Sequence, residues 1–459
     1  MRASVFKAYD IRGKADEDFT NEEVLRLGKA LGTYFIQQGF RRVIVGRDNR
    51  LHSPRLREAV VDGLVSCGCQ VFDIGETITP VFYFAHQLYD VQAGVMITAS
   101  HNPPEDNGFK VYAGDSTIYG EEIQKIRRLF EAGEFIAGNG QVEERNPREE
   151  YLEYIASRVR LGKPLKVVVD CGNGTAGPWA PALYKKMGCQ VIDLYCDSDP
   201  SFPNHHPDPT VTENLETLRE KVLEERADLG LAFDGDGDRL GVIDDKGKII
   251  WGDMLQILFW REILLKYPGA EAIIEVKCSQ ALVEEVKRLG GKPFFYKTGH
   301  SLIKAKMKEI GAVFTGEMSG HIFFADEYFG YDDALYAGAR LLRILSESDK
   351  PLSELLSDVP RYYATTETRI GCAEEAKGRV IESLKSYFRN KGYDIIDVDG
   401  VRVQFPEGWG LVRASNTQPV LVARCEGKSL NALKEIAGEM KQALSGMSEV
   451  EPFDWEIVD

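Results

Sequence analysis

Apolar residues recur along the chain with two periods, one typical of helices and the other of strands. In TNEEVLRLGKALGTYFIQQG (20–39) they fall every three or four positions, and Thr20 with Glu23 forms a capping box before them. RRVIVGRD (41–48) is a short apolar run rich in β-branched residues, which indicates a buried strand. The pattern therefore predicts a helix over 20–39 followed by a strand.

The same order of elements returns twice further along. LKVVVDCGNGTAG (165–177) and AIIEVKCSQAL (272–282) each combine an apolar run, a polar or glycine-containing turn and the start of a helix. Strands that alternate with helices are typical of parallel α/β units. We expect three similar α/β domains.

The tail has a different pattern. Residues 394–427 contain short apolar runs separated by turn residues, and 429–444 has helical spacing, so a smaller C-terminal α+β domain is predicted. A chain of 459 residues is too long for one core, and clefts between domains commonly bind ligands. We expect four domains around a central cleft, with these limits: 1–145, 146–248, 249–360 and 361–459.

Charge and cysteine content narrow the class of protein. Acidic residues outnumber basic ones by 72 to 56, so binding of nucleic acid or of an anionic membrane through bulk charge is not expected. The eight cysteines contain no C-x-x-C pair, which favours reduced thiols in a cytosol. No apolar leader and no run of about 18 apolar residues occurs, so a cytoplasmic protein is predicted. The sequence gives no oligomeric state.

The segment TASHNPPEDNGFK (98–110) has the composition of a reactive loop. Ser100 follows an apolar strand pattern, and ligands of open α/β sheets bind where strands end. Pro103 and Pro104 restrict the loop that follows. Taken alone, a surface loop whose polar groups bind backbone is the alternative, and the G-x-S-x-G elbow of serine hydrolases is absent.

The segment LAFDGDGDR (231–239) carries three carboxylates. Asp234, Asp236 and Asp238 occupy every second position after an apolar strand, with glycines between them. Clustered carboxylates favour a hard cation, and Mg²⁺ usually binds carboxylate together with phosphate oxygens. An EF-hand is unlike this pattern because Arg239 stands where its glycine is required, and a plain Asp-Gly turn is the alternative.

Two later segments add groups suited to a phosphorylated sugar. RASNTQP (413–419) offers a guanidinium, hydroxyls and an amide, a donor set that phosphate prefers. GEMSGHIFF (316–324) places Glu317 and Ser319 in a turn, where they could bind vicinal sugar hydroxyls. Each segment alone could also be a simple connection.

In this order, together with AYDIRG (8–13), the four segments resemble the signature loops of the α-D-phosphohexomutases over the full length of the chain. The resemblance implies that family's four-domain fold, with one loop per domain around the cleft. It also implies that Ser100 is a phosphoserine and that Ser100, Asp234, Asp236 and Asp238 hold Mg²⁺. The implied catalytic residues are Ser100, His101, Lys110, Arg12, Arg239 and His321, with Lys110 the preferred proton carrier and His321 the alternative. The implied substrate-binding residues are Tyr9, Lys277, His300, Glu317, Ser319, His321, Arg413, Ser415, Asn416 and Thr417.

The activity implied by the resemblance is interconversion of hexose 1-phosphates and hexose 6-phosphates through a 1,6-bisphosphate. Mg²⁺ is the implied cofactor, with glucose 1,6-bisphosphate or mannose 1,6-bisphosphate as activator. With Met318, the segment GEMSGH resembles that of the phosphomannomutase/phosphoglucomutase subgroup. This resemblance implies action on both mannose and glucose phosphates. A phosphoglucosamine mutase is the alternative.

Two other classes stay open. LAFDGDGD also resembles the strand and D-x-D of haloacid-dehalogenase-type phosphatases, with Asp234 as nucleophile. That hypothesis leaves the Ser100 loop without a role. A non-catalytic sugar-phosphate binder would need no nucleophile, so Ser100 and the three aspartates argue against it.

Overall fold

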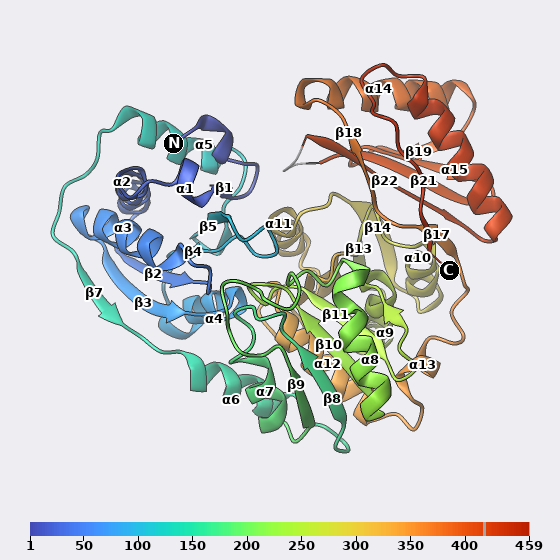
Figure 1. The fold of residues 1–459 in the computed structure, drawn as a ribbon, viewed down its shortest axis with the longest axis horizontal. Helices are drawn as coiled ribbons and strands as arrows, with labels where there is room; N and C mark the ends of the chain where they lie inside the picture. Colours follow the sequence, from blue (N-terminus) through green and yellow to red (C-terminus); the bar gives the residue numbers. More distant parts are fainter. Residues whose placement is uncertain (416–418, 459) are drawn as a thin grey trace. The chain divides into compact units, whose positions relative to one another are not determined.

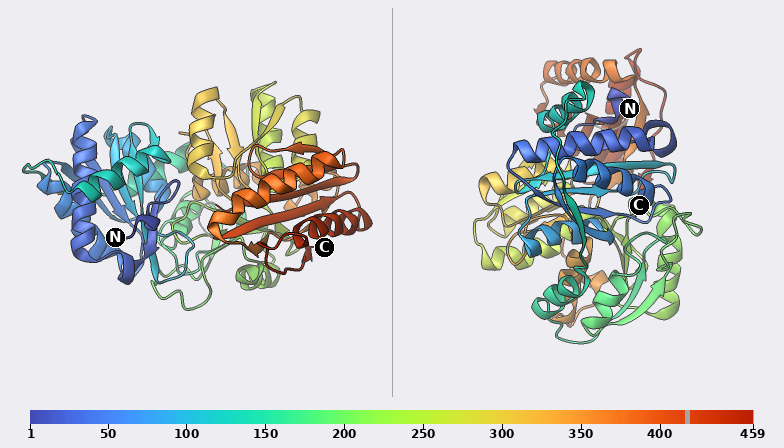
Figure 2. Two further views of the ribbon diagram at one scale, coloured as in Figure 1. Left: turned by 90° about the horizontal axis from the view of Figure 1, so that it is seen from above. Right: turned by 90° about the vertical axis from the view of Figure 1, so that its left-hand side faces the viewer.

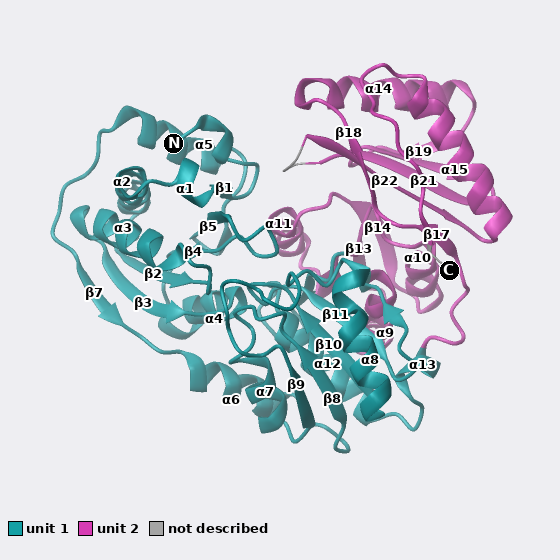
Figure 3. Ribbon diagram, in the orientation of Figure 1, with its two compact units in different colours: residues 1–252, 319–355 teal, residues 253–318, 356–459 magenta. Residues whose placement is uncertain are grey.

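The computed structural model describes residues 1–415 and 419–458, which divide into two compact units (Figure 3). Unit 1 contains residues 1–252 and 319–355, and unit 2 contains residues 253–318 and 356–459. Among the described residues, no helix combines the length and the apolar composition needed to cross a bilayer.

The N-terminal sheet of unit 1 has seven strands (Figure 1). In spatial order they are β1 (Ile11–Lys14), β5 (Asp106–Ala113), β4 (Ala93–Ile97), β2 (Arg42–Arg47), β3 (Gln70–Glu76) and β7 (Gln141–Glu144), with β6 (Ser116–Thr117) beside β5. The strands β4, β2, β3 and β7 are parallel, whereas β5 pairs antiparallel with both β4 and β1. The parallel strands therefore end at one edge, where the serine loop begins.

Helices cover both faces of this sheet. Its flanking helices are α1 (Ala15–Asp18), α2 (Asn21–Gln37), α3 (Ser53–Ser66), α4 (Thr79–Tyr89) and α5 (Glu121–Ala132). Val43 and Val45 share one apolar core with α2 and α3, whereas the intervening Ile44 faces the other way and α4 contacts β2 and β4. Successive strand residues point to opposite faces, so this apolar strand is buried on both.

The second sheet of unit 1 has five strands. In spatial order they are β12 (Ile249–Ile250), β11 (Leu240–Asp244), β10 (Leu229–Phe233), β8 (Lys166–Asp170) and β9 (Gln190–Leu194). The helices of this part are α6 (Arg148–Arg158), α7 (Ala180–Lys186), α8 (Glu216–Glu225), α12 (Ala334–Ser346) and the single turn α13 (Leu352–Leu355), and the short strand β16 (Ile322–Phe324) precedes α12.

Helix α12 belongs to unit 1 although its sequence follows the third predicted domain. It contacts β11, β16 and α7. The Tyr184 hydroxyl donates a 3.0 Å hydrogen bond to the Leu335 carbonyl, and the Tyr151 hydroxyl donates one of 3.0 Å to the Asp333 carboxylate. These contacts explain why residues 319–355 join unit 1.

The first sheet of unit 2 is parallel in the order β14 (Lys292–Tyr296), β13 (Glu271–Glu275) and β15 (Phe314–Gly316). Its helices are α9 (Gly252–Lys266), α10 (Gln280–Arg288) and α11 (His300–Ile310). The strand and the start of a helix predicted within 272–282 are therefore present.

The C-terminal sheet of unit 2 is antiparallel. Its strands are β19 (Asp394–Ile396), β20 (Val401–Phe405), β21 (Gly408–Ala414), β22 (Val420–Gly427), β17 (Tyr363–Thr365) and β23 (Ile457–Val458), with β18 (Thr368–Gly371) also paired to β22. Helices α14 (Glu374–Asn390) and α15 (Leu430–Ser445) lie next to each other along it, as Figure 2 shows. On the other face Trp409 and Leu411 pack against Val276.

The predicted fold class, three α/β domains followed by a smaller α+β domain, is confirmed. The four domain limits and the central cleft stay predictions.

Candidate active site

Ser100 stands at a strained turn directly after β4. Its φ is +52°, a left-handed conformation that is uncommon for residues other than glycine. The Ser100 backbone N–H donates to Thr98 Oγ1 at 2.9 Å, and only 4% of the residue is exposed. Such a conformation persists only where its surroundings hold it.

Arg50 binds the backbone of this loop. The residue is 1% exposed, and its Nε lies 3.3 Å from the carboxylate of Asp48. Its guanidinium donates to four loop carbonyls, those of Ser100 (2.8 Å), Asn102 (2.6 Å), Pro103 (2.6 Å) and Asp106 (3.0 Å). The planar fork of arginine can reach several acceptors at once, so one side chain fixes the path of the loop.

The three aspartates lie in the loop after β10 and are fully buried. A Cβ at Gly235 would stand 2.3 Å from the Ser100 carbonyl oxygen, so glycine is needed where the two loops meet. The Ser100 hydroxyl donates a 2.5 Å hydrogen bond to Asp234 Oδ2. The other oxygen of Asp234 accepts the backbone N–H groups of Asp238 and Arg239 at 3.0 and 3.1 Å.

Lys110 lies on β5 and joins the same cluster. Its ammonium donates to Asp236 Oδ2 at 2.8 Å and to Asp238 Oδ2 at 2.5 Å. Burial alone would lower the pKa of Lys110, but the two carboxylates outweigh burial and raise this pKa well above its ordinary value. Lys110 is therefore a protonated cation in this arrangement.

The aspartate cluster fits a divalent cation. One ligand atom from each of Asp234, Asp236 and Asp238 lies within 4.8 Å of the others. The Oδ1 atoms of Asp236 and Asp238 are buried and accept no hydrogen bond. Burial and the two neighbouring carboxylates raise the pKa of Asp234, because the negative charge of Asp234 is unfavourable in this buried cluster. Hard cations bind this kind of oxygen donor set.

Two histidines and two arginines surround the same centre. His321 Nε2 accepts from Arg239 Nε at 3.0 Å, and His321 Nδ1 lies 3.1 Å from the Asp332 carboxylate. His101 Nδ1 lies 3.0 Å from the Ser100 hydroxyl. Burial, with the charges of Arg239 and Arg12, lowers the pKa of His101 well below 6.5, so this imidazole is neutral.

Arg12 reaches the serine loop through a neighbour. Its guanidinium donates to Asn102 Oδ1 at 2.9 Å and pairs with Asp10 at 2.8 Å. Tyr9 lies two residues before β1 and Ser319 three residues before β16, both partly exposed.

In unit 2, charged and polar side chains connect three of the predicted substrate-binding positions. Arg413 Nε donates to Asp399 Oδ2 at 2.9 Å, and the same Asp399 oxygen accepts the Thr298 backbone N–H at 3.0 Å. The Thr298 hydroxyl donates to Glu275 at 2.5 Å, and Glu275 also accepts the backbone N–H of Lys277. Arg413, Lys277 and the turn before His300 are thereby held in one network.

Two carboxylates complete this part of unit 2. Lys277 is 6% exposed and its ammonium lies 2.8 Å from Glu367. Burial would raise the pKa of Glu367, but Lys277 outweighs it and lowers this pKa to about 2. Glu317 accepts the Gly299 backbone N–H at 2.7 Å, and Ser415 is partly buried at the end of β21. Asn416 and Thr417 lie outside the described residues.

Comparison with known proteins identifies the family. Domain families I, II, III and the C-terminal domain of phosphoglucomutase/phosphomannomutase match residues 3–137, 149–247, 251–363 and 367–443. The chain belongs to the phosphoglucomutase/phosphomannomutase family.

Relatives within the phosphoglucomutase/phosphomannomutase family match along the whole chain. A phosphomannomutase/phosphoglucomutase from Pseudomonas aeruginosa is 46% identical over 447 residues, which are 97% of this chain and 96% of the relative. A phosphoglucomutase from Neisseria meningitidis is 44% identical and covers 96% of each chain. The crystal structure of a family protein from Burkholderia thailandensis has a TM-score of 0.92 and 42% identity, covering 97% of this chain and 98% of that one.

Several residues that contact the candidate site carry no motif that could be recognised in the sequence. Arg50, Asp332, Glu367 and Asp399 are single charged residues outside the four signature segments. Apart from Asp48 beside Arg50, the partners named above lie 11 to 101 residues away, so only the folded chain brings them together. The one available hint was the pattern GRDNR, in which charged residues directly follow an apolar strand.

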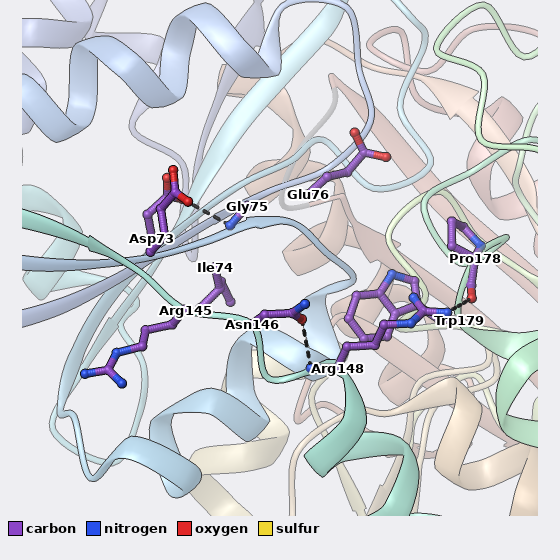
Figure 4. A pocket seen from close by; sticks show the side chains of 10 residues that line it. Asp73, Ile74, Gly75, Glu76, Arg145, Asn146, Arg148, Pro178 and Trp179 are labelled. Carbon is purple, nitrogen blue, oxygen red and sulfur yellow. Dashed lines mark hydrogen bonds between the residues drawn. The ribbon is translucent and has the colours of Figure 1, made fainter.

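A separate cavity of about 460 Å³ in unit 1 is not part of this centre (Figure 4). It is lined by Asp73, Glu76, Arg145, Arg148 and Trp179 among others. These polar side chains already have partners: Arg148 donates to the Pro178 carbonyl, and Asp73 accepts the Gly75 backbone N–H at 3.0 Å. The cavity therefore offers little unsatisfied chemistry to a ligand.

Proposed function

We propose that this protein interconverts hexose 1-phosphates and hexose 6-phosphates through a phosphoserine at Ser100 and a hexose 1,6-bisphosphate. The 2.5 Å hydrogen bond from the Ser100 hydroxyl to Asp234, inside a buried group of three carboxylates, is the observation that carries the proposal. It places a nucleophilic oxygen beside a candidate cation site, which phosphoryl transfer requires.

Asp234, Asp236 and Asp238 would hold Mg²⁺, together with an oxygen on Ser100. When bound, Mg²⁺ would neutralise charge on the phosphoryl oxygens. Arg12 and Arg239 supply further positive charge at this centre. His101 is neutral, so it does not place a second cationic donor on the Ser100 oxygen that would accept the phosphoryl group. Positioning and electrostatics are the terms on which this chemistry depends.

Lys110 and His321 are the two proposed proton carriers. Lys110 is protonated beside Asp236 and Asp238, and these carboxylates make its ammonium a weaker acid because they raise its pKa. His321 accepts from Arg239 at Nε2 and faces Asp332 at Nδ1, which holds one tautomer of the ring. Following the family resemblance, we keep Lys110 as the preferred proton carrier and His321 as the alternative.

The remaining predicted residues would bind the sugar phosphate. Glu317 and Ser319 would contact ring hydroxyls, because each offers an acceptor and Ser319 also a donor. Arg413 would grip the phosphate that is not reacting, with its guanidinium already oriented by Asp399. Further contacts are proposed for Tyr9, Lys277, His300, Ser415, Asn416 and Thr417.

We further propose that both mannose and glucose phosphates are substrates. These sugars differ only at C2, so contacts to other hydroxyls do not discriminate between them. The relatives from Pseudomonas aeruginosa and Neisseria meningitidis, named for phosphomannomutase/phosphoglucomutase and phosphoglucomutase, support this range. A ratio of kcat/KM above about a hundredfold, nearly 3 kcal/mol, would contradict it. Assay of glucosamine 1-phosphate beside them tests the phosphoglucosamine mutase alternative.

Glucose 1,6-bisphosphate or mannose 1,6-bisphosphate is the proposed activator, because either can phosphorylate an unmodified Ser100.

The net charge of −16 gives no support to nucleic-acid or membrane partners, and the eight free cysteines favour a cytoplasmic location.

The phosphatase alternative meets a geometric difficulty. Asp234 would have to attack phosphorus, yet its Oδ1 accepts two backbone N–H groups and its Oδ2 accepts the Ser100 hydroxyl. Family membership also favours the mutase.

Intact mass and activity of the wild type and of Ser100→Ala test the proposed function. After treatment with glucose 1,6-bisphosphate, the wild type should carry one phosphate and convert glucose 1-phosphate to glucose 6-phosphate with Mg²⁺. Ser100→Ala should carry none and lose activity by a factor of about a thousand or more. Ser66→Ala, whose hydroxyl donates to the Gly63 carbonyl at 2.7 Å, is the control and should behave as wild type. Phosphate on Asp234, released to solution, would establish the phosphatase instead.

A further inference from the structure

Two cysteines lie side by side at the ends of neighbouring strands in unit 1. Cys171 directly follows β8, and Cys196 lies two residues after β9, which pairs with β8 in parallel. Their sulfur atoms are 3.6 Å apart. A Cβ at Gly177 would stand 2.0 Å from the Cys196 carbonyl oxygen, so the two turns are in direct backbone contact.

The two thiols differ in access. The eight cysteines are all free, seven are buried, and Cys196 is the partly exposed one. Cys171 is 0% exposed, and burial together with its contact to Cys196 raises the pKa of its thiol. Reaction with an oxidant requires access and thiolate character, so Cys196 is the thiol that reacts first and Cys171 the one that follows.

We propose that Cys171 and Cys196 are a modification site that forms a reversible disulfide when the protein meets a peroxide. The Cys196 thiolate attacks one oxygen of hydrogen peroxide, and this step gives a sulfenic acid and hydroxide. The Cys171 sulfur then attacks the Cys196 sulfur, the S–O bond breaks and water leaves. Two thiols and one peroxide thus become one disulfide and two waters, and a small dithiol reverses the change.

The turn that begins at Cys171 connects to both loops of the proposed catalytic centre. The Asn49 side chain donates to the Asn173 carbonyl at 2.9 Å, and the Asn49 backbone N–H donates to Thr175 Oγ1 at 3.1 Å. Asn49 directly precedes Arg50, which holds the serine loop. The Thr175 backbone N–H donates to the Gly235 carbonyl at 3.0 Å, within the aspartate loop.

Closing the disulfide would therefore disturb catalysis. The sulfurs must approach from 3.6 Å to about 2.05 Å, which draws Cys171 toward the turn after β9. A displacement of about 1 Å in a reacting group can cost about a hundredfold in rate. We expect the oxidised protein to be about 10- to 100-fold less active as a mutase; this consequence for activity rests on the proposed function, whereas the disulfide itself does not.

Peptide mapping and activity after peroxide treatment test the proposal on the full chain. The wild type, Cys196→Ser and Cys372→Ser are each incubated with hydrogen peroxide, and free thiols are then blocked. In the wild type we expect a Cys171–Cys196 crosslinked peptide, a loss of two hydrogen masses, and reduced turnover of glucose 1-phosphate that dithiothreitol restores. Cys196→Ser keeps an O–H donor for the Val169 and Leu194 carbonyls, so its untreated activity should equal that of the wild type.

The controls separate this site from other oxidation. Cys196→Ser should resist peroxide, and Cys372→Ser, which removes a buried cysteine of unit 2, should be inhibited like the wild type. Equal inhibition of Cys196→Ser, or full activity of a wild type that is completely crosslinked, would overturn the regulatory part. Oxidation of other cysteines without the crosslinked peptide would overturn the site. If neither treated nor untreated protein shows mutase activity, the proposed function fails while the peptide map still decides the disulfide.

Discussion

Single buried charges determine the geometry of the serine loop. Arg50 binds four backbone carbonyls, and no other side chain of its size offers five N–H donors in one plane. A lysine has the same charge, but its three donors share one nitrogen and cannot span the same acceptors. Geometry, more than charge, is therefore what Arg50 contributes.

Arg50→Lys should lower kcat by about a hundredfold and change KM by less than about threefold, because Arg50 contacts the loop backbone and holds Ser100 in place. Steady-state kinetics measure both parameters. Arg47→Lys is the matched control, since Arg47 is the last residue of β2, three positions before Arg50, and binds Glu76 and the Asp48 carbonyl. It should retain at least half of the wild-type kcat. An unchanged kcat in Arg50→Lys would contradict the assignment, and thermal unfolding shows whether the variant is folded.

His205 should make stability depend on pH in a defined direction. Burial would lower the pKa of His205, but the Asp170 carboxylate, 3.1 Å from its Nε2, and the His206 carbonyl together outweigh burial and raise this pKa above 6.5. The charged pair therefore stabilises the folded state fully below pH 6.5, and this contribution is lost as the pH rises through the raised pKa. The difference in free energy of unfolding between wild type and His205→Gln should shrink from pH 6 to pH 9.

Urea unfolding of both proteins across this pH range measures the difference. Asp170→Asn is the control, because it keeps an acceptor for the Gly172 backbone N–H and removes only the charge. It should show the same pH dependence relative to wild type as His205→Gln. A difference that stays constant with pH would show that the pair is not charged in the folded state.

At the scale of elements, close backbone contact explains glycines that helix propensity alone would disfavour. In α2, a Cβ at Gly28 would stand 2.5 Å from the Val60 carbonyl oxygen, and in α3 a Cβ at Gly63 would stand 2.5 Å from the Leu25 carbonyl oxygen. Glycine costs about 1 kcal/mol in a helix interior compared with alanine. The close packing of the two helices offsets that cost.

Gly28→Ala should lower the free energy of unfolding by about 1–3 kcal/mol, because the added methyl group forces α2 and α3 apart. Gly378→Ala is the opposite control: no atom lies within 4 Å of a Cβ there, so the helix α14 should gain about 1 kcal/mol. Guanidinium unfolding followed by circular dichroism measures both. Equal effects of the two substitutions would mean that propensity, and not packing, decides at Gly28.

Some helices and strands could be predicted from the local sequence pattern, and others could not. The N-cap of the predicted capping box is confirmed, since the Thr20 side chain accepts the Glu23 N–H and α2 begins at Asn21. The Glu23 carboxylate accepts the Thr20 hydroxyl at 3.1 Å. The strand β5, which carries Lys110, was not predicted. Its pairing with β4 and β1 depends on contacts far apart in the sequence, which a local pattern does not contain.

At the scale of the whole molecule, sequence periodicity predicted the α/β repeats but not their grouping. Residues 319–355 follow the third repeat in the chain, yet their tyrosine and backbone contacts lie in unit 1. The signature segments could be found because glycines and prolines make them distinctive. The buried partners Asp332, Glu367 and Asp399 could not, because a single acidic residue in a sequence resembles any surface acid.

Metal binding should stabilise unit 1 selectively, because Ser100 and all three aspartates belong to it. A saturating divalent cation stabilises the folded state by about 3 kcal/mol at a hundredfold excess over Kd. Adding Mg²⁺ to chelator-treated protein should therefore slow hydrogen exchange in residues 94–110 and 229–244. The strands of the C-terminal sheet should be unchanged.

Asp236→Asn should abolish this protection, and the exposed Asp193→Asn should keep it. Hydrogen-exchange mass spectrometry and the activity of the chelator-treated wild type provide the two readouts. Protection that is equal in Asp236→Asn would place the cation elsewhere.

The division of unit 1 into two stretches of sequence has a consequence for biosynthesis. A ribosome completes residues 1–252 well before it reaches Asp333 and Leu335, the partners of the Tyr151 and Tyr184 hydroxyls. During that interval α7 and β11 lack the covering helix α12, so their apolar faces are open to solvent or chaperones. Completion of the unit that carries Ser100 thus waits for translation of residue 355, after the first segment of unit 2 has already been synthesised.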